Sequence, residues 1–132
     1  MLAAADVFVM PSLFERMPLA LLEAMAAGKT IVATRADGIT EAIDDGIEGR
    51  LVERENVRAL AQGILEALRG GAAVASWGNA ARHRFARDFT ADAMIESTLA
   101  LYRRQFAEKT SNGYAPMTHV EIDALETQMS PV

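Results

Sequence analysis

The chain has 132 residues, a formal net charge of −5 and no cysteine, and 51% of its residues are hydrophobic. The acidic balance argues against a nucleic-acid partner, and the absence of cysteine excludes a disulfide framework, a thiol nucleophile and a thiolate metal site. The two histidines, His83 and His119, are too far apart for metal-ligand spacing. No apolar run approaches the roughly 20 residues of a transmembrane segment. We expect a globular cytoplasmic protein.

The first part of the chain predicts a strand, a loop and a helix. Residues 1–5 look like the end of a helix, and residues 7–10 form an apolar run that suits a parallel strand covered on both faces. Pro11 and Ser12 end that strand. The next helix is predicted over residues 18–27, because Pro18 suits the first helical position and Gly28 suits a helix stop.

The following elements continue an alternation of strand and helix. The β-branched run at residues 30–34 predicts a second strand, residues 39–43 a short helix, and residues 50–52 a third strand. This order is typical of an α/β unit with right-handed crossovers. We expect a partial Rossmann-like unit of about three parallel strands flanked by helices.

After residue 53 the pattern becomes helical. Asn56 predicts a cap for a helix to about residue 68, residues 70–71 break it, and a further helix follows over 73–87. Thr90 predicts the cap of a last helix over 91–108, with one apolar stripe. The expected organisation is a domain over residues 1–107, followed by a linker and loosely packed tail over 108–132 with a short helix at 119–128.

Two carboxylates stand out in the loop and helix after the first strand. Glu15 lies on the loop, and Glu23 follows after seven intervening residues, inside a helix with no other charge. Leu19, Leu22 and Glu23 share a helical face, so the Glu23 carboxylate is predicted to lie on a buried apolar stripe. Helix N-termini favour anions, because the first-turn N–H groups have no intrahelical partner. We expect part of a phosphate-sugar or nucleotide site.

A family resemblance rests on two strings, ADVFVMPSLFERMPLALLEAMAAGKTIVAT and DGITEAIDDGIEGRLVE. Together they resemble the C-terminal half of GT-B glycosyltransferases of the retaining, glycogen-synthase-like type, known as glycosyltransferase family 4 or group 1. The match runs from about residue 6 to residue 68 and more weakly to residue 102. Two glutamates at this spacing are a weak signal alone, but the whole string is specific.

The resemblance implies a hexosyltransferase that binds a UDP- or GDP-sugar and transfers the sugar with retention, without a metal or other cofactor. It implies that Glu23 accepts hydrogen bonds from the donor ribose, while Glu15, the catalytic residue, holds the sugar hydroxyls. The backbone of residues 16–19 would face the sugar and diphosphate, and Ser12 is either a site residue or a strand-end turn former. The implied donor-binding residues are Ser12, Arg16, Met17, Pro18, Leu19 and Glu23.

The sequence also departs from the family pattern. Arg16 stands where the family usually has a small residue, and Asp37-Gly38 stands where it has a double glycine. The cationic diphosphate-binding residues and the N-terminal acceptor domain of the family have no counterpart in the 132 residues. We therefore expect a fragment that is inactive alone, exposes the edge of its first strand, and needs a missing N-terminal GT-B domain in cis or in trans.

Two alternatives to this reading stay open. The chain can be a non-catalytic nucleotide-binding or complementing interaction module, or part of another GT-B enzyme such as a nucleotide-sugar epimerase. The resemblance also leaves peripheral attachment to a membrane open.

The remaining polar and aromatic residues favour structural roles. His83 is expected at the surface, the arginines at positions 82, 84 and 87 on a solvated face, and Glu41 at a helix start. Trp77 and Phe85 are expected in the core or an interface.

Overall fold

The computed structural model describes residues 2–111, so the helix predicted at 119–128 lies outside the described residues. The chain forms two compact units, one ending at Ala93 and the other beginning at Met94. The boundary predicted after residue 107 stays a prediction. The first unit contains a 3-10 turn, η1 (Leu2–Ala4), then β1 (Val7–Met10), α1 (Leu19–Ala26), β2 (Thr30–Thr34), α2 (Asp37–Ala42), β3 (Arg50–Val52), α3 (Val57–Arg69) and α4 (Ala72–Asp88), and α5 spans Ala91–Ser111.

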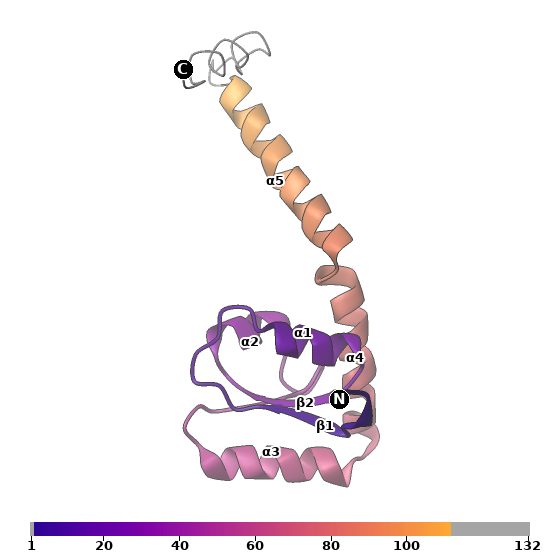
Figure 1. The fold of residues 1–132 in the computed structure, drawn as a ribbon. Coiled ribbons are helices and arrows are strands. Elements are labelled where there is room, and N and C mark those ends of the chain that lie inside the picture. The colour runs from indigo at the N-terminus through magenta and orange to yellow at the C-terminus, as the bar shows by residue number, and fades with distance from the viewer. Residues whose placement is uncertain (1, 112–132) are drawn as a thin grey trace, which may run out of the picture. The chain divides into compact units, whose positions relative to one another are not determined.

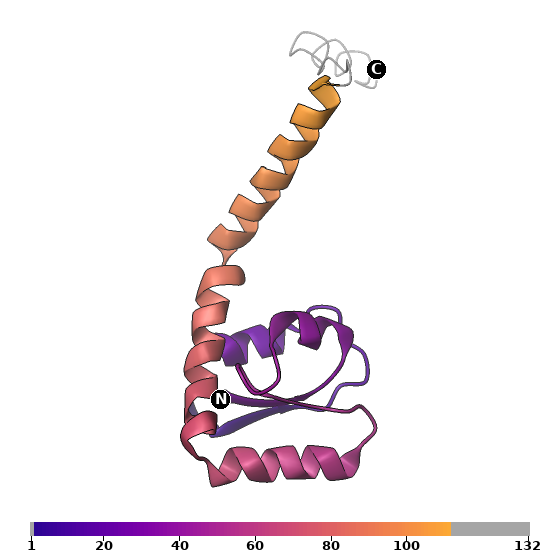
Figure 2. The same ribbon diagram turned by 180° about the vertical axis from the view of Figure 1, so that it is seen from behind.

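The three strands form one parallel sheet in the order β1-β2-β3. Val7 pairs with Thr30, and Val32 pairs with Arg50. Helices α1 and α2 cover one face of this sheet and α3 covers the other, as Figures 1 and 2 show from opposite sides. Parallel neighbours need a crossover connection, and helices supply it here. The predicted α/β fold is confirmed, and all three strands have the predicted bounds.

The hydrophobic core lies between the sheet and the layer of α1, α2 and α4. Its largest fully buried side chains include Leu21 and Met25 from α1, Ile31 from β2 and Ile39 from α2. Trp77 of α4 is 2% exposed, and its Nε1 donates to the carbonyl of Gly46 at 3.1 Å. The prediction for Trp77 is confirmed, and Phe85 is half-buried against the same core. Burial on this scale is the main force that holds the layers together.

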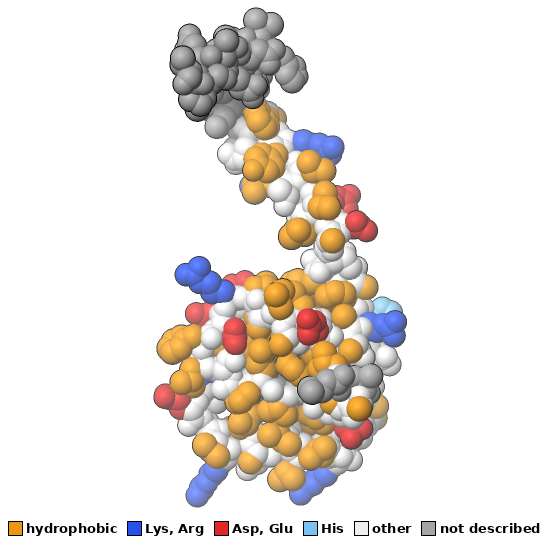
Figure 3. All heavy atoms as spheres, viewed as in Figure 1, with side chains coloured by type: hydrophobic (Ala, Val, Ile, Leu, Met, Phe, Trp, Pro, Cys, Tyr) orange, Lys and Arg blue, Asp and Glu red, His pale blue; other side chains and the backbone are white. Residues whose placement is uncertain are grey.

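Strand β1 lies at an edge of the sheet. All four of its side chains are half-buried. Phe8 and Met10 pack against the core, and α3 contacts the strand, so the prediction of cover on both faces holds in part. The expectation of an exposed apolar first-strand edge is confirmed. Figure 3 shows hydrophobic side chains gathered between α1 and α3 on this side of the first unit. An open apolar edge is a surface on which further chain can pair.

Local signals place most helix ends within a residue or two. The Asn56 side chain accepts the Ala59 N–H at 2.9 Å, and Thr90 accepts the Ala93 N–H at 3.2 Å, so both predicted caps are confirmed. Pro18 precedes α1 as its N-cap, with an extended backbone (φ −75°, ψ 110°), instead of opening the helix. Helix α2 begins at Asp37, before the predicted residue 39.

Helix α5 belongs mostly to the second unit. The stripe predicted for its packing consists of exposed side chains in the structure, namely Ile95, Leu99, Tyr102 and Phe106. None of the helices within residues 2–111 combines the length and apolar character needed to cross a membrane.

Candidate functional site

The candidate site lies where two parallel strands end. The loop at residues 11–18 carries the chain from β1 to α1, and residues 35–36 carry it from β2 to α2. In open α/β sheets, ligands bind in the crevice at the carboxyl ends of the strands. Every predicted site residue therefore lies on, or directly after, the connection that follows β1.

Glu15 is held both by its side chain and by its backbone. The Ser12 hydroxyl donates to Oε1 of Glu15 at 2.7 Å, and the Gly38 N–H donates to the Glu15 carbonyl at 3.0 Å. Ser12 and Glu15 are both half-buried. A hydrogen bond to an ionised carboxylate is stronger than one between neutral groups. The structure thus brings together two predicted residues, Ser12 and Glu15.

Thr34, at the end of β2, supports the same loop and is absent from the sequence-based site. Its hydroxyl lies within hydrogen-bond reach of the Ser12 carbonyl, the nearer acceptor, and 3.4 Å from the Met10 carbonyl. Thr34 is only 4% exposed. A hydroxyl has one proton, so the Ser12 carbonyl is its main partner. A threonine that closes an apolar strand is the only signal in the sequence that points to this role.

Gly38 allows the loop to lie directly on α2. A Cβ atom at this position would lie 1.5 Å from the carbonyl oxygen of Arg16, which is far inside contact distance. The space that a side chain at this position would need is therefore filled by the chain's own 11–18 loop. Because the Gly38 N–H already donates to Glu15, it is not available to a bound phosphate.

Glu23 lies on the outward face of α1. The helix buries Leu21, Ala24 and Met25, whereas Glu23 is exposed and Leu19 is 73% exposed. The prediction that Glu23 lies on a buried apolar stripe is wrong, because the sheet packs against the adjacent face of the helix. Among the described side chains of the first unit, none pairs with the Glu23 carboxylate. The Glu23 side chain is therefore accessible to solvent.

The other predicted residues form the loop that leads into α1. Arg16 and Met17 are exposed, whereas Pro18 is buried. The Pro18 carbonyl accepts the N–H groups of Leu21 and Leu22 at 3.0 and 3.3 Å. The N–H groups that remain at the start of this helix, on Leu19 and the residue after it, have no intrahelical acceptor.

Arg54 tethers the outer part of the loop. Its Nη1 donates to the Leu13 carbonyl at 3.2 Å, and its guanidinium lies 5.7 Å from the centre of the Phe14 ring. Leu13, Phe14, Arg54 and Glu55 line a shallow pocket of about 280 Å³. Phe14 is 81% exposed, so the apolar wall of this pocket faces solvent.

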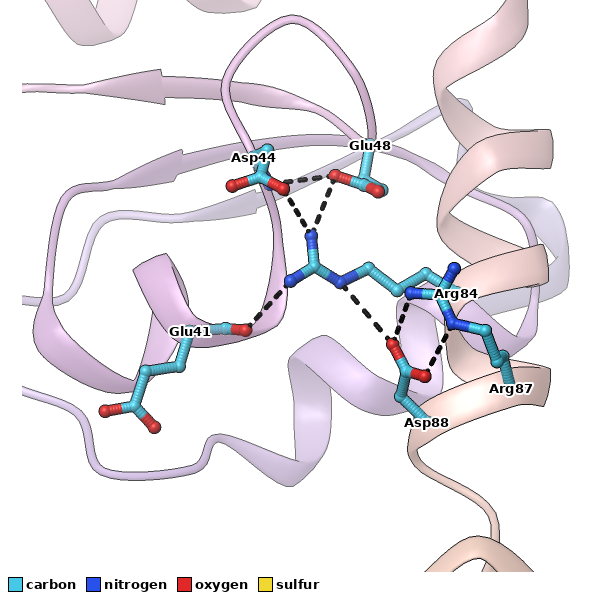
Figure 4. A network of polar contacts seen from close by, with 6 residues as sticks. All are labelled: Glu41, Asp44, Glu48, Arg84, Arg87 and Asp88. Carbon is cyan, nitrogen blue, oxygen red and sulfur yellow. Dashed lines mark hydrogen bonds and ion pairs between the residues drawn. The ribbon is translucent and has the colours of Figure 1, made fainter.

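A second polar cluster, around Arg84 of α4, anchors the loop between α2 and β3 (Figure 4). Arg84 Nη1 lies 2.7 Å from Asp44 Oδ2 and 3.3 Å from Glu48 Oε2, and Nη2 donates to the Glu41 carbonyl at 3.1 Å. Glu48 is 7% exposed and also accepts the Asp44 N–H at 2.8 Å. Glu41 thus contributes its backbone to the fold.

The prediction of a solvated arginine face holds for two of its three members. Arg82 is exposed, and the side chain of Arg87 is 72% exposed, but that of Arg84 is only 18% exposed. The prediction for Arg84 is wrong because the 44–49 loop packs over it. His83 is exposed, as predicted.

The side-chain hydrogen bond from Arg87 lowers the pKa of the Asp88 carboxyl.

Comparison with known families places this site in a defined group. A sequence profile described as Glycosyl transferases group 1 matches residues 1–70, which is 70 of 132 residues. The matched region contains the whole 11–18 loop, both carboxylates, Thr34 and Gly38. It also contains all three strands.

Individual relatives and solved structures agree with this family. The alpha-maltose-1-phosphate synthase of Mycobacterium tuberculosis is 36% identical over 109 residues, which cover 78% of this chain and 28% of the relative. The sucrose-phosphate synthase of Thermosynechococcus elongatus superposes with a TM-score of 0.71 at 32% identity, over 81% of this chain and 27% of that one. Anabaena HepE, solved in complex with UDP-glucose, superposes with a TM-score of 0.64 at 25% identity, over 84% of this chain and 29% of that one. The chain spans less than a third of the length of each.

Proposed function

The chain belongs to the family of group 1 glycosyl transferases, and on that premise we propose that residues 11–38 bind the nucleotide-sugar donor of a retaining sugar transfer. The observation that carries this proposal is the pair of carboxylates on two consecutive segments, the 11–18 loop and helix α1. Glu15 is held by Ser12 and Gly38, and Glu23 is exposed on the helix that follows. The likeness to HepE, which was solved with UDP-glucose, makes a UDP-sugar the first donor to test.

Glu23 is the proposed ligand of the donor ribose. A vicinal diol offers two O–H donors, which one ionised carboxylate accepts through two charge-assisted hydrogen bonds. An exposed carboxylate without a cationic partner suits this role, because binding breaks no existing ion pair.

Glu15 is the proposed ligand of the sugar hydroxyls next to the reacting carbon. The backbone of residues 16–19, together with the start of α1, faces the diphosphate, where the helix N-terminus favours negative charge. In this scheme the two glutamates do not act as a general acid and a general base. Both hold the donor in the geometry of transfer, and positioning alone can supply a large part of a rate enhancement.

The 132-residue chain is proposed to bind a donor without transferring its sugar. It spans only 28% of the Mycobacterium tuberculosis relative, and the family it resembles uses an N-terminal domain to hold the acceptor. The acceptor site would then come from that N-terminal domain in cis or in trans, and the cations that neutralise the diphosphate from the first half of the donor-binding domain, upstream of the residues present here. Measurable transfer from UDP-glucose by the purified chain would contradict this part of the proposal.

Calorimetric titration with UDP tests the ribose assignment. We expect Glu23→Gln to weaken UDP binding about tenfold or more, because it removes a charged acceptor of two hydrogen bonds. The matched control is Glu96→Gln, which changes an exposed helical glutamate outside the site. Absence of UDP binding by the wild type, or equal affinity of Glu23→Gln and wild type, would overturn the assignment.

A complementing interaction module is the second candidate. The open edge of β1, whose four side chains are half-buried, favours it. In that case the chain completes the sheet of a separate N-terminal part. Co-purification with such a part, and loss of the pairing when Phe8 is replaced by lysine, would support this candidate over donor binding alone.

A further inference from the structure

The connection after β1 contains a chain of hydrogen bonds that ends on the Glu15 carboxylate. Thr34 at the end of β2 donates to the Ser12 carbonyl, and the Ser12 hydroxyl donates to Glu15 Oε1 at 2.7 Å. The Glu15 carbonyl in turn accepts the Gly38 N–H at 3.0 Å. The loop that carries Glu15 is thus fixed to β2 and to α2.

The groups at the base of this chain are rigidly placed. Thr34 is 4% exposed, and Gly38 is buried beneath the Arg16 backbone. Both lie on regular secondary structure, which holds a supporting hydrogen bond in place better than a loop does. Ser12 and Glu15 are half-buried, so the end of the chain of hydrogen bonds reaches the surface.

We propose that Ser12 and Thr34 are positioning residues for the Glu15 carboxylate. The Ser12 hydroxyl donates to Oε1 of Glu15. The other carboxylate oxygen, Oε2, then accepts a hydrogen bond from a hydroxyl of the sugar in the nucleotide-sugar donor. Thr34 fixes Ser12 by holding its carbonyl. The inference rests on the proposed donor site. In it, Ser12 and the buried Thr34 contribute to the binding of the sugar group of the donor, and they do not contribute to the binding of its nucleotide group.

A purely structural Ser12 would behave differently from a positioning one. A turn former affects the stability of the loop and hence the binding of every ligand equally. A residue that orients Glu15 affects only the ligand group that Glu15 contacts. Glu23 provides an internal reference, because none of the described side chains of the first unit holds its carboxylate.

The first arm of the test needs no ligand. In NMR ¹³C relaxation of the glutamate methylenes, we expect the Glu15 side chain to be more ordered than that of Glu23. Ser12→Ala should make Glu15 as mobile as Glu23, and Ser12→Thr, which keeps the hydroxyl, should restore its order. Thr34→Val should loosen Glu15 and Thr34→Ser should not. The matched control is Ser76→Ala, which removes a hydroxyl that donates to the Ala73 carbonyl at 2.7 Å on α4.

The second arm compares UDP-glucose with UDP by calorimetric titration. Loss of one oriented hydrogen-bond acceptor should weaken UDP-glucose binding about fivefold in Ser12→Ala. The affinity for UDP should stay unchanged, and Ser12→Thr should restore the affinity for UDP-glucose. Equal weakening of both ligands would overturn the positioning role and make Ser12 a structural residue.

The two arms separate this inference from the proposed function. If Glu15 in the wild type is as mobile as Glu23, or if Ser12→Ala leaves it ordered, the positioning role is overturned whatever the ligand does. If Glu15 loses its order in Ser12→Ala but the wild type binds neither UDP nor UDP-glucose, the hydrogen-bond chain is supported and donor binding by this chain is overturned.

Discussion

Two carboxylate-bearing regions of the first unit differ in what holds their charges. Around Arg84, the carboxylates of Asp44 and Glu48 face a guanidinium at 2.7 and 3.3 Å. Around the loop at residues 11–18, the Glu15 carboxylate accepts the Ser12 hydroxyl and faces no cation, and the Glu23 carboxylate has no side-chain partner, among the described side chains of the first unit.

The contrast separates a structural cluster from a candidate binding site. A buried carboxylate needs a partner, and Glu48 at 7% exposure has one in Arg84. Glu15 is half-buried and Glu23 is exposed, and the carboxylates of both are the proposed acceptors of ligand hydroxyls. Substitutions in the first region should therefore change stability, and those in the second should change binding.

The largest expected effect is on a residue whose substitution should change both stability and ligand binding. Gly38→Ala should destabilise the fold by about 3 kcal/mol or displace the 11–18 loop, because its Cβ would lie 1.5 Å from the Arg16 carbonyl oxygen. Urea unfolding measures the loss, and binding of UDP-glucose should disappear with it. Gly70→Ala is the control, since its φ of 71° gives backbone strain but no atom lies within 4 Å. It should cost only about 1 kcal/mol. Equal losses in the two variants would mean that the close approach at Gly38 is unimportant.

Arg84→Leu should lower the stability of the fold without changing ligand binding. Removal of the guanidinium leaves the buried Glu48 carboxylate without its cation, and we expect a loss of about 2 kcal/mol in the free energy of unfolding, less than for a fully buried pair. The affinity for UDP should not change. Arg82→Leu, at an exposed position on the same helix, should have little effect on either. A loss of UDP affinity with unchanged stability would contradict the division between the two regions.

The smallest effect is expected where the ion pair is exposed. The Arg87 side-chain hydrogen bond lowers the pKa of Asp88 below its ordinary value of 3.8. A lowered folded-state pKa contributes stability above the unfolded-state pKa, and this is lost as the pH falls through the folded-state pKa. Because the side chain of Arg87 is 72% exposed, solvent screens the pair. The acid-unfolding curves of Asp88→Asn and wild type should nearly coincide, and a clear shift of the midpoint would show that the pair is not merely a surface contact.

Local chemistry made much of this fold predictable. The strands at 7–10, 30–34 and 50–52 follow from short apolar or β-branched runs between turn residues, and the caps Asn56 and Thr90 act within three residues of themselves. The family resemblance, from the same residues, placed Ser12 and Glu15 in one site. Their hydrogen bond spans three positions and could form from local geometry alone.

What the sequence by itself determined is the order and type of the elements, the caps, and the connection that carries Glu15 and Glu23. Tertiary structure alone decided which face of α1 is buried, so that Glu23 is exposed, and which arginine of α4 is enclosed. It also decided that Thr34 and Gly38 support Glu15. These outcomes depend on contacts between segments 22 to 43 positions apart, such as Thr34 with Ser12 and Arg84 with Glu41. Such contacts depend on how the layers pack together, and the residue pattern within one segment does not show which other segments will pack against it.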